Sequence, residues 1–226
     1  MGGRTAPALL ALCLILAIAQ ACGPAGRWVA FEPDGAGYRS VPLSTAPEVA
    51  VSRLLTADLD ADGRPEGVRW EGGRVYVERD GEIVWESEPQ WRIVDVAAGD
   101  AWNDLRQEVV MALWKDDSSG TSRSHPFIMG HRHGRYDLLW GGSAAAAPIR
   151  DLDLGDVDGD GQNELVVLEG DYGEAESAPA RYVTVWRWNG WGFTLLWRSA
   201  AGRFRYLHLV DVDGDGRVEI MVQEID

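Results

Sequence analysis

Three stretches of the chain share the pattern D-x-D-x-D-G-x-x-E, in which a glutamate stands eight residues after the first aspartate. Alternating aspartates on a tight turn can direct their carboxylates at one centre, and calcium takes six to eight such oxygen ligands. Without a cation these carboxylates would repel one another. We therefore predict about three calcium ions, bound by Asp58, Asp60, Asp62, Arg64 (through its carbonyl) and Glu66; by Asp156, Asp158, Asp160, Gln162 and Glu164; and by Asp211, Asp213, Asp215, Arg217 and Glu219.

A fourth copy of the pattern is degenerate. It keeps Asp100, Asp104 and Glu108 at the same offsets but has Trp102 and Leu105 where the other copies have aspartate and glycine. One ligand and the permissive glycine are therefore missing, and we expect a metal-free copy braced by hydrophobic contacts. We name the four segments the Asp58, Asp100, Asp156 and Asp211 loops (residues 58–66, 100–108, 156–164 and 211–219).

Short β-like segments surround each loop. Apolar residues stand four and seven positions before the first aspartate, and an apolar run such as 165–168 follows the glutamate. Between loops, two more such runs flank a turn, as residues 75–77 and 83–85 do. No long segment has helical periodicity. The repeated unit is therefore four short strands, which is the blade of a β-propeller.

The two ends of the chain complete this pattern. Residues 28–31, 38–43 and 49–55 indicate three strands, and residues 219–223 indicate a first strand without partners. Their pairing would close a ring and leave no free sheet edge. We predict an all-β fold over residues 28–226, a small β-propeller of four blades, each a four-stranded antiparallel sheet. An open stack, or a ring completed by another chain, is the alternative.

Three such loops between strands resemble the FG-GAP or VCBS-type repeats of integrin-α-like propellers. The loops are not EF-hands, because the twelfth position holds Arg69, Val167 or Val222 instead of glutamate. The resemblance implies structural calcium and work in adhesion or partner recognition. The chain differs from that family in having four blades instead of the usual seven, and no clear FG…GAP signature.

The first 21 residues have the pattern of a targeting segment. Arg4 precedes an apolar run at residues 8–19, which is too short to span a bilayer. The run ends in Ala19-Gln20-Ala21-Cys22, which resembles a bacterial lipobox. We predict a lipoprotein signal peptide at residues 1–21, lipidation of Cys22, a linker at 22–27 and an extracytoplasmic position anchored to the cell or outer membrane. Ordinary cleavage near Ala21 is the alternative.

Composition and the lack of catalytic motifs reduce the number of function classes that fit this sequence. A net charge of −15 argues against nucleic acid, whose phosphates require clustered Lys and Arg. No Ser-His-Asp set, phosphate loop or reactive cysteine is present. We predict a binding module for a protein or glycan partner and no enzymatic activity. Its candidate ligand surfaces are the loops at residues 116–124 and 170–176 with Tyr172, and the turn residue Trp191. A propeller lyase or hydrolase with a central-channel site, or an envelope scaffolding factor, is the alternative.

Overall fold

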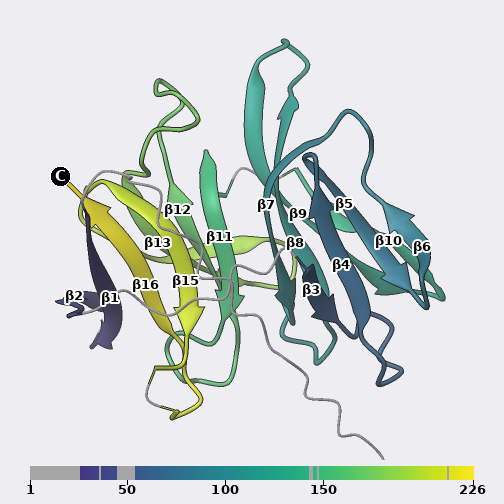
Figure 1. Ribbon diagram of the computed structural model, residues 1–226, viewed down its shortest axis with the longest axis horizontal. Helices are drawn as coiled ribbons and strands as arrows, with labels where there is room; N and C mark the ends of the chain where they lie inside the picture. The colour runs from purple at the N-terminus through teal and green to yellow at the C-terminus, as the bar shows by residue number, and fades with distance from the viewer. Residues whose placement is uncertain (1–25, 36, 45–53, 143–144, 147, 213) are drawn as a thin grey trace, which may run out of the picture.

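The computed structural model describes residues 26–35, 37–44, 54–142, 145–146, 148–212 and 214–226, and their regular secondary structure is entirely β (Figure 1). The strands form four antiparallel sheets of four strands, which is consistent with a four-bladed propeller. No helix in this part of the chain is long and apolar enough to cross a membrane. The predicted fold class is confirmed.

Each sheet takes consecutive strands, except the one that joins the chain ends. The first sheet holds β3 (Leu54–Ala57), β4 (Glu66–Glu71), β5 (Arg74–Arg79) and β6 (Glu82–Glu86). The second holds β7 (Arg92–Gly99), β8 (Glu108–Asp116), β9 (Ser122–Arg132) and β10 (Arg135–Gly141). The third holds β11 (Ile149–Gly155), β12 (Glu164–Glu169), β13 (Tyr182–Trp188) and β14 (Phe193–Arg198). The closing sheet is ordered β15 (Phe204–Val210), β16 (Glu219–Ile225), β1 (Gly26–Asp34) and β2 (Gly37–Pro42).

The closing sheet confirms the pairing of the two chain ends. β1 runs antiparallel to β16, with Phe31 opposite Ile220 and Gly26 opposite Ile225. The strand therefore begins inside the predicted linker at residues 22–27. The expected division into three N-terminal strands and one C-terminal strand is wrong, because each end supplies two strands.

The reason for this error is the position of the loops within the sheets. β3 pairs with β4 directly across the Asp58 loop, with Ala57 opposite Glu66. A tight turn returns the chain beside the strand it has just left, so the strands on either side of a loop share one sheet. The strand before the Asp58 loop therefore belongs to the first sheet instead of the closing one. Residues 49–53 of that predicted strand lie outside the described part of the chain.

Strands buried on both faces hold the sheets together. In β8, Val109 and Met111 join a core cluster with the first sheet, while Val110 and Ala112 join a cluster with the third. A third cluster links the third and closing sheets, with Val166 at its centre. Within the described ranges no such cluster spans the first and closing sheets. Within the described residues, the four sheets therefore pack through three cores.

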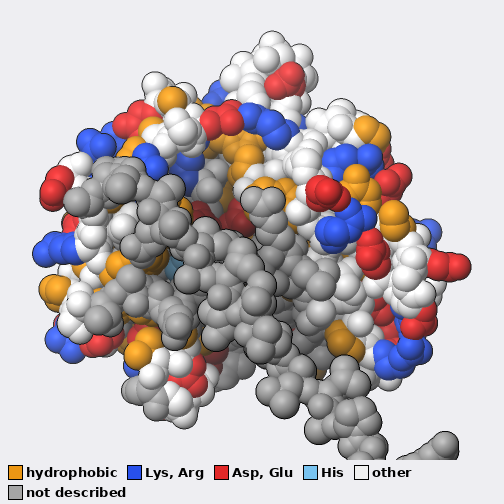
Figure 2. Space-filling view, in the orientation of Figure 1, with side chains coloured by type: hydrophobic (Ala, Val, Ile, Leu, Met, Phe, Trp, Pro, Cys, Tyr) orange, Lys and Arg blue, Asp and Glu red, His pale blue; other side chains and the backbone are white. Residues whose placement is uncertain are grey.

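Connections of two kinds lie at opposite ends of the sheets. Figure 1 shows the four loops that follow β3, β7, β11 and β15 at one end, and the long β8–β9 hairpin and the β12–β13 connection at the other. In Figure 2, acidic and basic side chains are interspersed over the described part of one face. The fold thus separates the predicted metal loops from the longest insertions.

Candidate functional site

The glutamate that ends each loop holds that loop in place. Glu66, Glu108, Glu164 and Glu219 are all buried at the start of the strand that follows. One carboxylate oxygen of each accepts the backbone N–H of the loop's second residue, from Leu59 at 2.8 Å, Ala101 at 3.0 Å, Val157 at 3.1 Å and Val212 at 2.9 Å. Because the degenerate Asp100 loop shares this contact, the glutamate has a structural role in every copy.

The first aspartate of each loop also folds its own turn. The carboxylate of Asp58 accepts the N–H groups of Asp62 at 3.1 Å and Gly63 at 2.8 Å. Asp100 makes the equivalent contacts with Asp104 at 3.0 Å and Leu105 at 2.7 Å. The Asp156 and Asp211 carboxylates likewise accept two N–H groups each from later glycines of their loops. Hydrogen bonds within the chain therefore help to shape these turns.

Two loops bring together carboxylates that fit calcium. Ligand oxygens of Asp58, Asp60 and Asp62 lie within 4.8 Å of one another, and the same holds for Asp156, Asp158 and Glu164. Clustered carboxylate oxygens are the donors that this hard cation prefers. Calcium at these loops remains a prediction.

The remaining predicted ligands lie in the same loops with other partners. Backbone N–H groups of Arg64, Gln162 and Arg217 each donate to the aspartate two residues earlier, at 2.9 Å. The Asp160 carboxylate lies 2.7 Å from Arg187, and Glu219 lies 3.0 Å from Arg217. Asp213 and Cys22 lie outside the described residues.

Sequence reasoning missed the arginines that face the loops. Arg79 contacts Asp60 and Asp62, with Glu66 at 3.4 Å. Arg187 lies 2.9 Å from Asp158, 2.7 Å from Asp160 and 2.5 Å from Glu164. The signal was present in the sequence: Arg79, Arg132 and Arg187 each stand two or three residues before a hairpin glycine.

Electrostatics in the loops depends on these arginines. Burial raises the pKa of Glu164 to about 7, against the opposing effect of Arg187. Burial likewise raises the pKa of Glu108 to about 7, against the effect of Arg132. Although burial opposes it, contact with Glu164 and its neighbours raises the pKa of Arg187, so the guanidinium stays charged. The loops therefore combine buried carboxylates with a fixed positive charge.

The Asp100 loop is braced by aromatic side chains, as expected. Trp102 stacks on Trp188 of the third sheet with ring centroids 5.4 Å apart. The guanidinium of Arg132 lies 5.0 Å from the Trp102 ring. Leu105, which replaces the loop glycine, is 94% exposed and has a φ of 70°, a conformation that is unfavourable for leucine. Trp102 thus occupies the place of a ligand and contributes packing.

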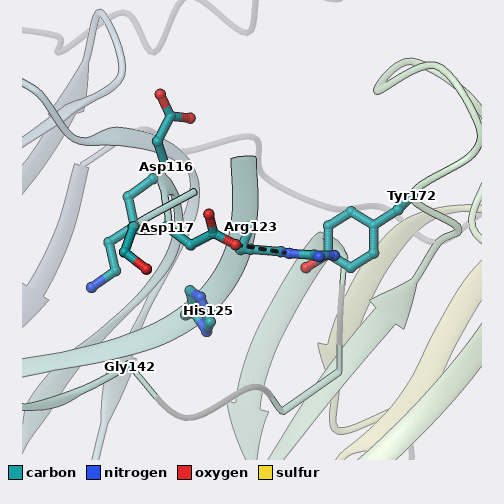
Figure 3. Close-up of a pocket in the computed structure, with 8 residues that line it drawn as sticks. Asp116, Asp117, Arg123, His125, Gly142 and Tyr172 are labelled. Carbon is teal, nitrogen blue, oxygen red and sulfur yellow. Dashed lines mark ion pairs between the residues drawn. The ribbon is translucent and has the colours of Figure 1, made fainter. Parts of the chain in front are cut away.

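A pocket of about 610 Å³ lies at the opposite end of the sheets. It is lined by Lys115, Asp116, Asp117, Ser118, Arg123, His125, Gly142 and Tyr172. Figure 3 shows Arg123 extended between Asp117 and Tyr172. Its guanidinium lies 3.6 Å from Asp117 and 5.2 Å from the centre of the Tyr172 ring. The two candidate ligand loops therefore form one pocket, which Lys115 and His125 also line.

Trp191, the other ligand-surface candidate, lies elsewhere. It is 80% exposed in the turn between β13 and β14, and this turn follows the end of β13 at which Arg187 meets the Asp156 loop. Its carbonyl accepts the indole N–H of Trp140 at 2.9 Å. The structure therefore does not bring Trp191 and Tyr172 together.

Buried aspartates join neighbouring sheets through the inner strands. Asp95 of β7 accepts the Leu152 N–H at 2.7 Å, and Asp151 of β11 accepts the Leu207 N–H at 2.9 Å. The carboxyl groups of Asp95 and Asp151 also hydrogen-bond to each other. Burial raises the pKa of both carboxyl groups, which favours their protonated forms. Both residues stand five positions before a loop aspartate, a regularity that the sequence analysis did not use.

Comparison with known families supports the loop interpretation over part of the chain. Residues 156–222 match the model of the FG-GAP-like repeat, a type associated with binding modules. This segment runs from the Asp156 loop through the third sheet and into β16. No curated protein matches the chain. The chain therefore contains an FG-GAP-like repeat in a fold of four β-sheets.

Proposed function

We propose that this chain is a lipid-anchored binding module outside the cytoplasm, with calcium in its loops and a glycan-binding pocket at the opposite end. The observation that carries the proposal is that the two longest insertions meet in one pocket on a packed scaffold. Loops positioned by a rigid scaffold commonly carry binding sites. The FG-GAP-like repeat supports a binding role.

The walls of the pocket are tied to the scaffold. The Tyr172 hydroxyl accepts the backbone N–H of Ser124 at 3.0 Å, and the Ser124 hydroxyl accepts the Ile149 N–H at 3.0 Å. The volume of about 610 Å³ lies within the range of small-ligand sites. The lining combines carboxylates, basic groups and a hydroxyl with one aromatic ring. Such a mixture of donors and acceptors suits a polar ligand such as a sugar.

A printed glycan array probed with the full chain in detergent tests the pocket. We expect binding to a subset of glycans, reduced at least tenfold in Tyr172→Ala. Trp191→Ala removes a more exposed aromatic ring away from the pocket and serves as the matched control, with unchanged binding. Equal binding by the two variants would refute the pocket. Binding only to intact envelopes, lost after protease treatment, would favour a protein partner.

Two measurements test the remaining parts of the proposal. Cys22→Ala should remove the membrane-bound pool, and an unchanged pool would refute lipidation. Titration calorimetry should find about three calcium ions, with a melting temperature that rises in calcium relative to chelator, because a ligand that binds only the folded state stabilises it. No binding together with no shift would refute the metal assignment.

A channel-site hydrolase is a second candidate, favoured by the Asp95–Asp151 pair. Two carboxyl groups that share a proton can act as acid and base. Their oxygens already accept backbone N–H groups of the neighbouring strands, which instead suggests a structural link between the sheets. Screening the chain against glycoside and ester substrates would decide, because activity abolished by Asp151→Asn without loss of fold would establish an enzyme.

A further inference from the structure

Arg79 and Arg187 occupy equivalent positions in two sheets. Arg79 follows Glu78 in β5. Because Glu78 pairs with Gly67, Arg79 lies across from Glu66. Arg187 follows Trp186, which pairs with Leu165, so it lies across from Glu164. From there each guanidinium reaches three carboxylates of its loop. The two arginines therefore meet the same carboxylates that are predicted to bind calcium.

The arginines are held by these contacts and only partly open to solvent. The Arg79 and Arg187 side chains are 28% and 22% exposed, while Glu66 and Glu164 are wholly buried. Tyr136 of the second sheet donates its hydroxyl to Glu66 at 2.9 Å, which leaves this carboxylate fully engaged. A guanidinium supplies one positive charge with five donors in a planar fork, and so can bridge several carboxylates.

The closing sheet differs at the same position. Phe31 pairs with Ile220, so the residue across from Glu219 is Glu32. The Glu32 carboxylate is bound by Arg39 at 2.9 Å. The cross-strand arginine is therefore a feature of particular loops and does not follow from the repeat itself.

We propose that Arg79 and Arg187 are built-in counter-cations that keep the Asp58 and Asp156 loops folded without calcium, and that calcium binds there only by displacing the guanidinium. This inference rests on the calcium part of the proposed function. A guanidinium and a calcium ion cannot both lie among the same three carboxylates. The apparent calcium affinity then falls in proportion to the fraction of molecules in which the loop is free.

Calcium affinity and melting temperature of the full chain in detergent test this competition. Arg187→Met keeps the aliphatic stem and removes the charge. If the arginine occupies its loop about nine-tenths of the time, the calcium Kd of one site should fall about tenfold in the variant. In chelator Arg187→Met should melt below the wild type, and saturating calcium should close that gap. Arg79→Met should do the same at the Asp58 loop.

Arg198→Met is the matched control. Arg198 pairs with buried Glu169 at 2.9 Å in the same sheet, at the end of β12 opposite the Asp156 loop. Its removal should lower the melting temperature equally in calcium and chelator and leave the calcium Kd unchanged. If Arg187→Met behaves like this control, the arginine is only structural and the proposal is overturned. If Arg187→Met does not fold, Arg187→Lys takes its place, because lysine keeps the charge but cannot bridge three carboxylates. An unchanged calcium Kd in Arg187→Lys also overturns the proposal.

The outcomes separate this inference from the calcium assignment. Calcium binding by the arginine variants but not by the wild type would support the counter-cation role and refute structural calcium at these two loops. Binding by the wild type with the same Kd in every variant would overturn the counter-cation alone. No binding by any of these proteins would overturn both.

Discussion

The shared proton of Asp95 and Asp151 makes stability depend on pH in a direction that can be measured. Asp151→Asn replaces one carboxyl by an amide of nearly the same shape. The N–H₂ of the new amide can donate to Asp95 where the proton does now, and its carbonyl can still accept the Leu207 N–H. The variant therefore keeps the link between the sheets and removes the titrating group of residue 151, which leaves Asp95 as the remaining carboxyl of the pair.

The dependence of stability on pH follows from the protons that the folded Asp95–Asp151 pair retains. Burial raises the pKa of the pair in the folded state, whereas the unfolded aspartates ionise near pH 4. The folded wild type should therefore hold more protons than the unfolded chain above this pH, so its stability falls as the pH rises toward the raised pKa, by at most about 1.4 kcal/mol per pH unit for one proton. Glu108 and Glu164, whose pKa values burial also raises, titrate in both proteins and cancel in the difference.

Urea unfolding in chelator at pH 4.5, 5.5 and 6.5 measures this difference. The stability of the wild type relative to Asp151→Asn should fall as the pH rises, by up to about 1.4 kcal/mol per pH unit. Glu82→Gln removes an equal formal charge at an exposed position and should run parallel to the wild type. Parallel curves for Asp151→Asn as well would refute the shared proton.

Three further predictions concern packing and the loops. Phe31→Ala should cost about 3–5 kcal/mol in urea unfolding, because Phe31 packs on Trp197 of the third sheet and Phe204 of the closing sheet. Ile83→Ala at an exposed edge should stay within about 0.5 kcal/mol. A loss below 1 kcal/mol for Phe31→Ala would contradict closure by this sheet. Glu108→Gln should lower stability by about 1–3 kcal/mol, equally in calcium and chelator; recovery in calcium would show that this loop binds metal. Leu105→Gly should raise the melting temperature slightly, because it relieves a positive φ, and a lower value would show that the exposed leucine contributes contacts.

Local pattern determined much of this protein. The spacing of aspartate, glycine and glutamate depends on contacts within nine residues, so the four loops could be located from the sequence. Short apolar runs beside the loops and turns predicted the strands, and the continuous runs at 109–113 and 165–168 became strands buried on both faces. The degenerate spacing likewise predicted that Trp102 would brace the Asp100 loop.

Only the tertiary structure decided which strands share a sheet and which side chains meet across them. The predicted division of the closing sheet between the two chain ends was wrong, because a strand's partner depends on where the turn returns the chain. An apolar run predicts a strand but does not indicate which strand it pairs with. Arg79 and Arg187 reach their loops from a strand more than ten residues away, and Asp95 meets Asp151 across two sheets. The pocket joins segments about 50 residues apart, because Tyr172 docks on Ser124. Contacts of this kind depend on how the sheets pack, and one-dimensional spacing does not contain that information.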